Sequence, residues 1–261
     1  MCLLVFSYKQ HPVYDFIFAT NRDEFYKRPT RPAQFWDDYP NILAGKDLKA
    51  GGTWLGITKD GKFSALTNYR DPSIQKEDPP SRGHLVLDYL KGGKTMGQYL
   101  QDVDKKANLY NGFNLLGGDL SGKAAGLMYY SNRQQDIEAL DAGLYGLSNR
   151  LLDTPWPKVK KAKRALASMI STGEVTEKKL FELLEDDTKA PDEDLPDTGI
   201  PHELERAVSP IFIKTDRYGT RNSTVILVEK SGKVIFEERR FKNGSQIVEE
   251  TNRYEFQIEH E

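Results

Sequence analysis

The first twenty residues hold two segments, Cys2–Tyr8 and Val13–Thr20, whose apolar and β-branched side chains occupy both odd and even positions. A strand with one face in solvent alternates apolar and polar residues, whereas a strand covered on both faces is apolar at both parities. The short stretch Gln10-His11-Pro12 between the segments predicts a tight turn. We therefore expect the chain to begin with a β-hairpin in a sheet that other layers cover on both sides.

Further strand patterns follow along the chain, separated by turn signals. Thr53–Thr58 and Lys62–Tyr69 are expected to form a second hairpin across Lys59-Asp60-Gly61, because Asp-Gly is a strong hairpin signal. The stretch Lys27–Tyr39 is rich in proline and charge and is expected to be an irregular loop. The remaining strands are predicted at Phe113–Leu116, Ala124–Tyr130, Leu144–Leu147, Ile211–Lys214, Ser223–Glu229, Val234–Phe241 and Arg253–Ile258.

Two regions show the periodicity of helices instead. After Pro79-Pro80-Ser81, apolar residues recur on one side of a segment that ends at Gly92-Gly93. After Pro155 they recur at helical spacing as far as Ile170, and Thr176 is expected to cap another helix. Strands, then helices, then strands again predict an α+β fold, with residues 1–261 as a single domain around one large core.

The stretch 186–210 departs from both patterns, because it is acidic, rich in proline and aperiodic. It is longer than a connection between two elements needs to be, and its composition cannot bury much apolar surface. We expect it to be a mobile flap over a binding pocket and not a packed element.

The composition excludes several classes of protein. With 37 basic and 39 acidic residues the net charge is −2, which gives no reason to expect attraction to nucleic acid or to an anionic membrane. No apolar run reaches the roughly 18 residues of an integral membrane segment, and no basic residue precedes the N-terminal apolar run as a signal peptide requires. A single cysteine excludes a disulfide scaffold and fits a reducing compartment, so a cytoplasmic location is expected.

The common metal and cofactor motifs are absent from the sequence. The four histidines form no His-Glu-x-x-His motif and there is no cysteine pair, so neither a metal site nor a cofactor is predicted. His84 and Asp88 stand one helical turn apart, where a surface ion pair is the favoured interpretation over a shared ligand. The glycines of Gly51-Gly52-Thr53-Trp54-Leu55-Gly56 lack the spacing of a dinucleotide-binding loop and are interpreted as turn and packing positions.

The only cysteine follows the initiator methionine. Removal of Met1, which is common when the next residue is small, would put a free α-amine and a thiol on Cys2. An α-amine titrates near ~7.7–8.0 and can act as general base for the thiol, so that one residue supplies both nucleophile and base. The alternative is a buried apolar residue on a strand, as most free cysteines are.

The tetrapeptide Asn21-Arg22-Asp23-Glu24 follows the second predicted strand, and the hairpin brings it alongside Cys2. Asp23 is a candidate to hold the α-ammonium, and Arg22 is a candidate to stabilise the thiolate and lower the thiol pKa. From the pattern alone, four polar residues after an apolar strand are equally well explained as a solvated strand end.

Several motifs, spread almost from end to end, make the chain resemble a known family. They are Met1-Cys2, Asn21-Arg22-Asp23-Glu24, Gly51-Gly52-Thr53-Trp54-Leu55-Gly56, Leu66-Thr67-Asn68-Tyr69-Arg70, Ser148-Asn149 and Tyr218-Gly219-Thr220-Arg221. Together they resemble the NRDE family of transport-and-Golgi-organisation type 2-like proteins, which is similar to N-terminal-nucleophile hydrolases of the choloylglycine hydrolase and penicillin acylase type. This resemblance implies a four-layer αββα sandwich of two antiparallel sheets flanked by helices.

The resemblance to the hydrolases also implies roles for individual residues. Cys2 matches the nucleophile, and Asp23 matches the aspartate that hydrogen-bonds the α-amine. Asn68 matches an asparagine that helps to form the oxyanion hole, and Asn149 matches a second asparagine that positions the amine and the oxyanion. From the pattern alone both asparagines are interpreted as turn residues.

Two arginines complete the candidate catalytic set. Arg221 matches loosely an arginine beside the hydrolase pocket, although its position alone indicates a solvated strand start. The hydrolases carry an arginine three residues before the aspartate, where this chain has Thr20, and Arg22 is the candidate to replace it.

Two functions from different classes follow from these residues. The first is an acyl hydrolase that cleaves an amide or ester of a small-molecule substrate through a cysteine thioester. The second is a non-catalytic carrier or chaperone for haem or a lipid-like ligand, because the NRDE family has been linked to haem movement and lipid metabolism. Cys2 or a histidine would then ligate the haem iron. The sequence leaves the substrate and the oligomeric state open.

Overall fold

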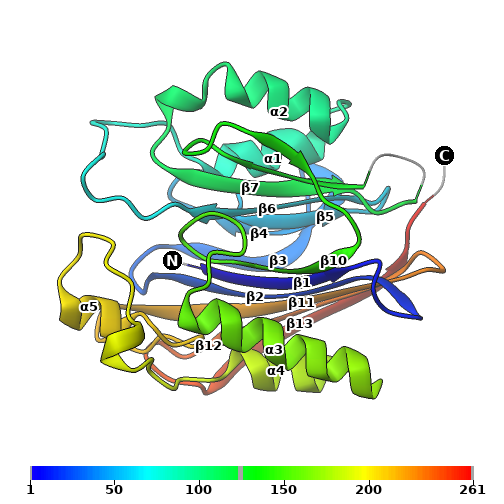
Figure 1. The fold of residues 1–261 in the computed structure, drawn as a ribbon. Helices are drawn as coiled ribbons and strands as arrows, with labels where there is room; N and C mark the ends of the chain where they lie inside the picture. Colours follow the sequence, from blue (N-terminus) through cyan, green and yellow to red (C-terminus); the bar gives the residue numbers. More distant parts are fainter. Residues whose placement is uncertain (1, 123–125, 260–261) are drawn as a thin grey trace.

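The computed structural model describes residues 2–122 and 126–259, in which two antiparallel sheets are stacked between pairs of helices (Figure 1). The expected removal of Met1 and the predicted strand start at Ala124 lie outside the described residues.

The sheet that contains the start of the chain has six strands in the order β10-β1-β2-β11-β12-β13. Its strands are β1 (Cys2–Tyr8), β2 (Tyr14–Phe25), β10 (Gly143–Leu147), β11 (Tyr218–Glu229), β12 (Lys233–Phe241) and β13 (Val248–Gln257). All of its pairings are antiparallel, and β1 and β2 form the predicted hairpin, with Cys2 opposite Arg22 and Tyr8 opposite Phe16.

The second sheet has seven strands, and each is paired with its neighbour in sequence. They are β3 (Thr30–Trp36), β4 (Tyr39–Asp47), β5 (Leu55–Thr58), β6 (Lys62–Asn68), β7 (Phe113–Asp119), β8 (Leu127–Ser131) and β9 (Ile137–Ala139). The predicted hairpin across Lys59-Asp60-Gly61 is confirmed as β5 and β6.

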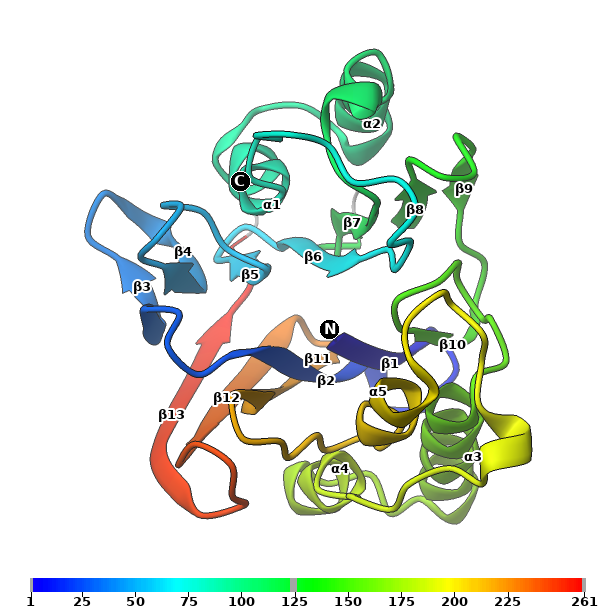
Figure 2. The ribbon, with the colours of Figure 1, turned by 90° about the vertical axis from the view of Figure 1, so that its left-hand side faces the viewer.

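Helices cover the outer face of each sheet (Figure 2). The seven-stranded sheet carries α1 (Gly83–Lys91) and α2 (Met96–Asp104), and the six-stranded sheet carries α3 (Pro157–Thr172) and α4 (Glu177–Leu184). Thr176 caps α4 as predicted, since its hydroxyl accepts a hydrogen bond from the Lys179 backbone. Shorter helical turns lie at Ala107–Leu109, Asp192–Asp194 and α5 (His202–Ala207). Within the described ranges, none of the helices has the length and apolar character needed to span a bilayer.

Three apolar clusters hold the four layers together, one between the sheets and one under each helix pair. In β1, Leu4 and Phe6 enter the cluster between the sheets, whereas Leu3 and Val5 enter the cluster under α3 and α4. A strand with apolar residues at both parities thus lies between two apolar layers, which confirms the α+β, αββα expectation.

The prediction of an irregular loop at Lys27–Tyr39 is wrong, because β3 lies within this stretch and pairs with β4, which the sequence analysis missed. Proline removes a ladder hydrogen bond and is tolerated mainly on edge strands and at bulges. Both conditions hold here, since β3 is the edge strand of its sheet and its register shifts between Arg31 and Gln34, around Pro32.

One further prediction is wrong, and one helix was not predicted. Ile211–Lys214 is not a strand: its apolar side chains are buried, but its one strand-like contact is an isolated bridge from Lys214 to Gly219. Helix α2 was not predicted, although Thr95 and Gln98 form a capping box at its start.

Candidate active site

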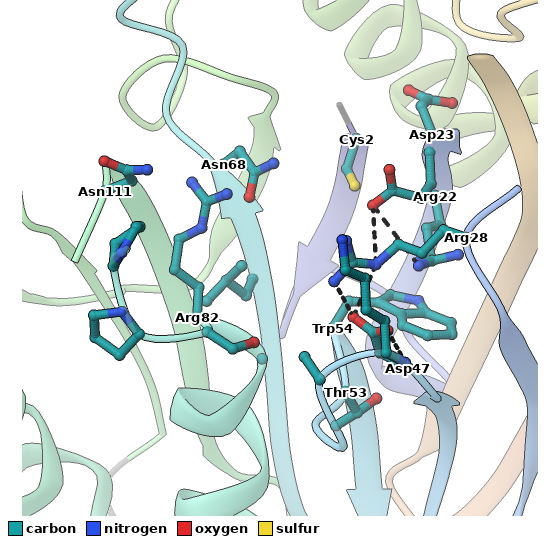
Figure 3. A pocket seen from close by; sticks show the side chains of 18 residues that line it. Cys2, Arg22, Asp23, Arg28, Asp47, Thr53, Trp54, Asn68, Arg82 and Asn111 are labelled. Atoms are coloured by element: carbon teal, nitrogen blue, oxygen red, sulfur yellow. Dashed lines mark hydrogen bonds and ion pairs between the residues drawn. The ribbon is translucent and has the colours of Figure 1, made fainter. Parts of the chain in front are cut away.

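Cys2, the first residue of β1, lines a cavity of about 350 Å³ where the two sheets meet (Figure 3). One wall comes from the six-stranded sheet through Cys2 and Arg22, and the other comes from the seven-stranded sheet through Asn68. The backbone of Cys2 is held by its pairing with β2 and by the Ser148 hydroxyl, which donates to the Cys2 carbonyl at 3.0 Å. The nucleophile candidate therefore occupies a fixed position beside open space.

Burial raises the pKa of the Cys2 thiol, and the charge of Asp23 adds to this effect. A hydrogen bond from the Asp23 backbone and the charge of Arg22 oppose the shift without reversing it. In the described chain desolvation penalises the thiolate more than the nearby arginine stabilises it. The lowered pKa predicted from the sequence concerns Cys2 with a free α-ammonium after loss of Met1, and it stays a prediction.

The tetrapeptide at 21–24 is not a solvated strand end. Asn21, Arg22 and Asp23 are 0 %, 6 % and 3 % exposed, so three of its four side chains lie in the interior. The Asn21 amide donates to the carbonyls of Leu184 and Ile211 at 2.8 and 2.9 Å, which ties β2 to the end of α4. Asn21 is thus a structural residue on the side of β2 that faces the helices.

Arg22 lies on the other side of β2 and stacks on Trp54, with its guanidinium carbon 4.0 Å from the centre of the ring. The indole also packs closely on Gly45, where a Cβ would lie 2.4 Å from a ring carbon. Beneath Arg22, burial raises the pKa of Glu238 to about 7, while this carboxyl accepts hydrogen bonds from the Ala33 backbone and the Asn222 amide. The cavity wall at Arg22 is therefore rigidly supported.

Asp23 is held from the neighbouring strand β11. Its Oδ1 accepts a hydrogen bond from the Thr220 hydroxyl at 2.7 Å, and its carbonyl accepts one from the Tyr218 hydroxyl at 2.9 Å. The Tyr218-Gly219-Thr220-Arg221 motif therefore positions Asp23. Burial raises the pKa of the Asp23 carboxyl, and the charge of Lys158 opposes this shift.

Lys158, in the first turn of α3, is a buried cation that the sequence analysis did not select. It is 4 % exposed, and its Nζ donates to the Val208 carbonyl at 2.9 Å. Burial lowers the pKa of Lys158 to about 8, against the attraction of Asp23. A signal was present in the sequence, because Lys158 stands four residues before Ala162 and therefore on the apolar face of α3.

The acidic stretch 186–210 contains α5, which its aperiodic pattern did not predict. Glu205 of α5 is 3 % exposed and forms an ion pair with Arg70, whose guanidinium also lies over the Trp156 ring. The expectation of a stretch without packed elements is therefore wrong at α5, although its mobility stays a prediction. The described residues that line the Cys2 cavity include none from this stretch, which lies at the same end of the sandwich (Figure 1).

The two candidate asparagines are neighbours with different surroundings. Asn68, at the end of β6, is exposed and lines the cavity. Asn149 is 0 % exposed, does not line the cavity, and donates from its side-chain amide to the Asn68 carbonyl at 2.7 Å. Asn149 therefore fixes the backbone of Asn68 from behind.

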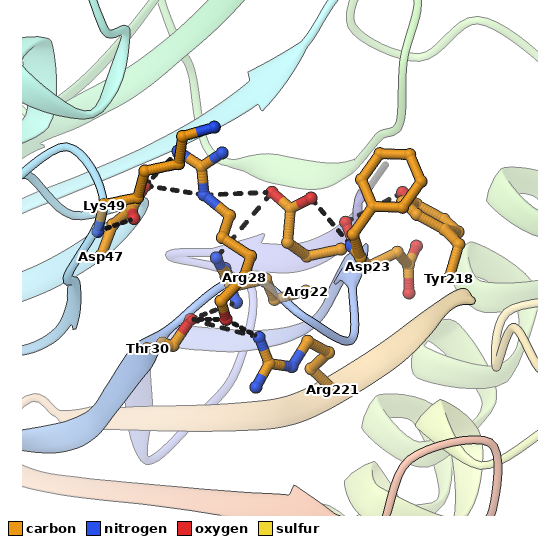
Figure 4. Close-up of polar contacts among 10 residues, drawn as sticks. Arg22, Asp23, Arg28, Thr30, Asp47, Lys49, Tyr218 and Arg221 are labelled. Carbon is orange, nitrogen blue, oxygen red and sulfur yellow. Dashed lines mark hydrogen bonds and ion pairs between the residues drawn. The ribbon is translucent and has the colours of Figure 1, made fainter.

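Arg221 is turned away from the Cys2 cavity. Its guanidinium donates to the Arg28 carbonyl and lies 3.4 Å from the Thr30 hydroxyl, on the far side of Arg22 (Figure 4). Thr20 donates its hydroxyl to the Leu3 carbonyl at 2.8 Å. Of the six candidates, the structure gathers Cys2, Arg22, Asp23 and Asn68 around one cavity.

The glycines at 51 and 52 shape the opposite wall. Gly51 has a φ of +78°, and a Cβ on Gly52 would lie 2.5 Å from the carbonyl carbon of Gly83 at the start of α1. This close approach brings Arg82 to the cavity, a residue that no motif in the sequence marks. No group of side chains suited to a metal ion occurs within the described ranges, and Asp88 pairs with Lys91 at 2.8 Å.

Comparisons with known proteins identify relatives of this chain by sequence. A family model described as Transport and Golgi organisation 2 matches residues 1–243. The Transport and Golgi organization 2 homolog of Mus musculus is 40% identical over an alignment 276 residues long. The alignment covers 99% of this chain and 100% of that protein. The homolog of Homo sapiens is 38% identical over 276 residues, with the same coverage of both chains.

Among solved structures, the chain is similar to a mutant of conjugated bile acid hydrolase from Clostridium perfringens. The TM-score is 0.56 at 10% sequence identity, and the match covers 97% of this chain and 92% of that one. At this identity the likeness concerns the fold, which is that of the N-terminal-nucleophile hydrolases. The sequence matches carry the family assignment: this chain belongs to the Transport and Golgi organisation 2 family.

Proposed function

We propose that the protein is an acyl hydrolase in which Cys2 cleaves an amide or ester through a thioester intermediate. One observation carries the proposal: the first residue of β1 exposes a thiol to a cavity that Asp23 and Asn68 also line. Loss of Met1 would turn the Cys2 backbone nitrogen into a free α-amine next to that thiol. The single cysteine favours a reducing compartment, so the cytoplasm is the proposed location.

In the first half of the proposed reaction, the α-amine accepts the thiol proton while the sulfur attacks the carbonyl carbon of the substrate. The carbonyl oxygen becomes an oxyanion, for which Asn68 is the proposed hydrogen-bond donor. The ammonium then returns the proton to the leaving nitrogen or oxygen as its bond to carbon breaks, and a thioester on Cys2 remains. Water, activated by the same amine, attacks the thioester, releases the acid and restores the thiol.

The raised pKa of Cys2 is compatible with this sequence of steps. A buried neutral thiol keeps its proton until the α-amine removes it, so no permanent thiolate is needed. Asp23, which Thr220 holds in place, is proposed to orient the amine and to stabilise the ammonium that forms. Arg22 is proposed to stabilise the departing negative charge on sulfur from the same wall.

The carrier alternative has less support from the cavity. Haem and lipids are apolar over most of their surface, and ligand pockets generally match their ligands in polarity. Arg22, Glu24 and Arg28 are among the many charged side chains that line this cavity. None of its described lining residues is a histidine, which leaves Cys2 as the candidate ligand for haem iron.

The test begins with intact mass, which must show a chain without Met1. Incubation with a library of N-acyl amides should then give turnover and a transient acyl adduct on Cys2. Cys2→Ala should abolish both, whereas Cys2→Ser should turn over slowly because a hydroxyl is a weaker nucleophile at neutral pH. Asn68→Ala should lower kcat about a hundredfold to a thousandfold with little change in KM, because an oxyanion donor acts mainly on the transition state.

Asn41→Ala is the matched control, since Asn41 is an exposed asparagine on β4 that does not line the cavity. Full activity in Cys2→Ala would refute the proposed mechanism. A Soret shift on haem titration, together with no turnover of any amide or ester, would replace it with the carrier function.

A further inference from the structure

The cavity beside Cys2 carries an uneven distribution of charge. On the side formed by β2 and β4 its carboxylates are already engaged by arginines. Arg28 contacts Asp47 at 2.6 Å and Glu24 at 3.7 Å, and Arg22 lies 3.9 Å from Glu24 (Figure 4). These charges compensate one another, so this side offers little net attraction for a charged ligand.

Arg82 stands on the opposite side, immediately before α1. Its Nη1 donates to the Gly112 carbonyl at 2.8 Å, and it forms no ion pair with any residue that the structure describes. Figure 3 shows its guanidinium extending along the wall toward Asn68, the proposed oxyanion donor. A guanidinium has five N–H donors, so most of the hydrogen-bonding capacity of Arg82 remains for a ligand.

A partly buried cation without a counter-ion carries a desolvation cost, which a bound anion would relieve. Burial lowers the pKa of Arg82, and the distant attraction of Glu24 opposes this shift only in part. Helix α1 adds to the positive potential, because its N-terminal end borders the cavity and its first turn contains no acidic residue.

The number of charged side chains that line the cavity indicates the charge of the anion. Among the residues that the structure describes, four cationic side chains line the cavity, from Arg22, Arg28, Lys49 and Arg82. It is lined by three carboxylates, from Asp23, Glu24 and Asp47. One positive charge is therefore left when all seven side chains are ionised. Because the proposed α-amine of Cys2 must be neutral to act as the base, this excess matches a monoanion. A multiply charged group would meet repulsion from the three carboxylates.

The volume restricts the ligand further. At about 350 Å³ the cavity is near the lower end of the roughly 300–1,000 Å³ of ligand pockets, and polar and charged residues outnumber apolar ones among its described lining residues. Both features favour a short polar compound over a long-chain acyl group.

We propose that the substrate is a short amide or ester that carries one carboxylate, and that Arg82 binds this carboxylate while Cys2 attacks the scissile carbonyl. The inference rests on the proposed hydrolase function, but its first test needs no turnover. Arg82 is then the residue that determines specificity, and a planar carboxylate suits the fork of its guanidinium.

The first test uses the fact that Cys2 is the only cysteine. Methanethiosulfonate reagents of similar size, carrying a carboxylate, no charge or a trimethylammonium group, are allowed to react with the full chain. The carboxylate reagent should react fastest relative to a free thiol, by roughly tenfold for an interaction near 1.4 kcal/mol. Arg82→Gln should remove this preference and Arg82→Lys should keep part of it. The control Arg164→Gln removes the same charge at an exposed position and should leave the preference intact.

The second test uses p-nitroanilides that differ in one group. Succinic acid mono-p-nitroanilide should have at least a tenfold higher kcat/KM than butyryl p-nitroanilide, and Arg82→Gln should bring the two together. N-acetyl-4-aminobenzoate and N-acetyl-4-aminobenzamide test a carboxylate on the leaving group in the same way. Equal reagent preference in the native chain and in Arg82→Gln would overturn the inference. A preference without turnover of any substrate would retain the anion site and refute the hydrolase function instead.

Discussion

Replacing Gly52 by alanine tests whether the close approach of the 51–53 segment to α1 holds the cavity wall in place. A Cβ at this position would lie 2.5 and 2.7 Å from the carbonyl carbon and oxygen of Gly83, and 2.9 Å from the backbone nitrogen of His84. Carbon contacts prefer about 3.5–4.0 Å, so the segment and α1 must separate by roughly 1 Å. All three atoms belong to the backbone, so no flexible side chain can move aside.

Overpacking of this kind costs about 1–3 kcal/mol of unfolding free energy. For a chain of 261 residues, 1 kcal/mol corresponds to about 2 °C in Tm, so Gly52→Ala should melt about 2–6 °C lower. Gly93→Ala is the matched control, because nothing lies within 4 Å of a Cβ built there. Thermal unfolding followed by tryptophan fluorescence measures both variants. Equal Tm values would show that the close approach carries no packing cost and would refute the reasoning.

Three further changes follow from buried charges and contacts. Glu205→Gln removes the carboxylate that pairs with Arg70, so limited proteolysis should cut faster within residues 186–210, whereas Glu203→Gln on the exposed side of α5 should leave the rate unchanged. Because burial raises the pKa of Glu238 from 4.5 to about 7, its folded form binds a proton more tightly than its unfolded form. Its contribution to stability is therefore complete below pH 4.5 and lost as the pH rises to about 7, up to about 3 kcal/mol. Urea unfolding should show a smaller loss over this range in Glu238→Gln, and an unchanged profile would contradict the assignment. Asn149→Ala leaves the Asn68 carbonyl without its donor and should lower kcat and Tm together; a fall in Tm with unchanged kcat would make Asn149 purely structural.

That the first hairpin is covered on both sides was predictable because β1 and the first part of β2 are apolar at both parities, a pattern that arises when two apolar layers enclose a strand. The four-layer arrangement itself was implied by the family resemblance. The β3 strand was missed for a physical reason. An edge strand needs ladder hydrogen bonds on one side only, so it tolerates Pro32 and charged residues that a central strand would exclude. At Ile211–Lys214 apolar residues predicted a strand that does not form. Phe212 and its neighbours are buried by packing, without a regular ladder of hydrogen bonds.

In the candidate site, sequence reasoning found the residues that belong to local motifs. The predicted hairpin placed Arg22 and Asp23 beside Cys2, and the family resemblance selected Asn68; all four residues line one cavity. Arg82 and Lys158 were not found, because their importance depends on which partners surround them. A surface arginine and one without a counter-ion beside a cavity look alike in sequence, and the difference appears only once distant segments are packed together.

Strand β1 lies inside its sheet, between β2 and β10, and this determines when the N-terminal thiol becomes enclosed during synthesis. Gly143, the first residue of β10, leaves the ribosome roughly 140 residues after Cys2, which takes on the order of 10–30 s at 5–20 residues per second. Through that interval one edge of β1 has no partner, and the N-terminus is open to methionine aminopeptidase and to oxidants alike. If Met1 is removed during synthesis, as proposed above, slower translation of the first half of the chain lengthens the time before β10 pairs with Leu4–Tyr8 and should increase the fraction of protein that loses Met1.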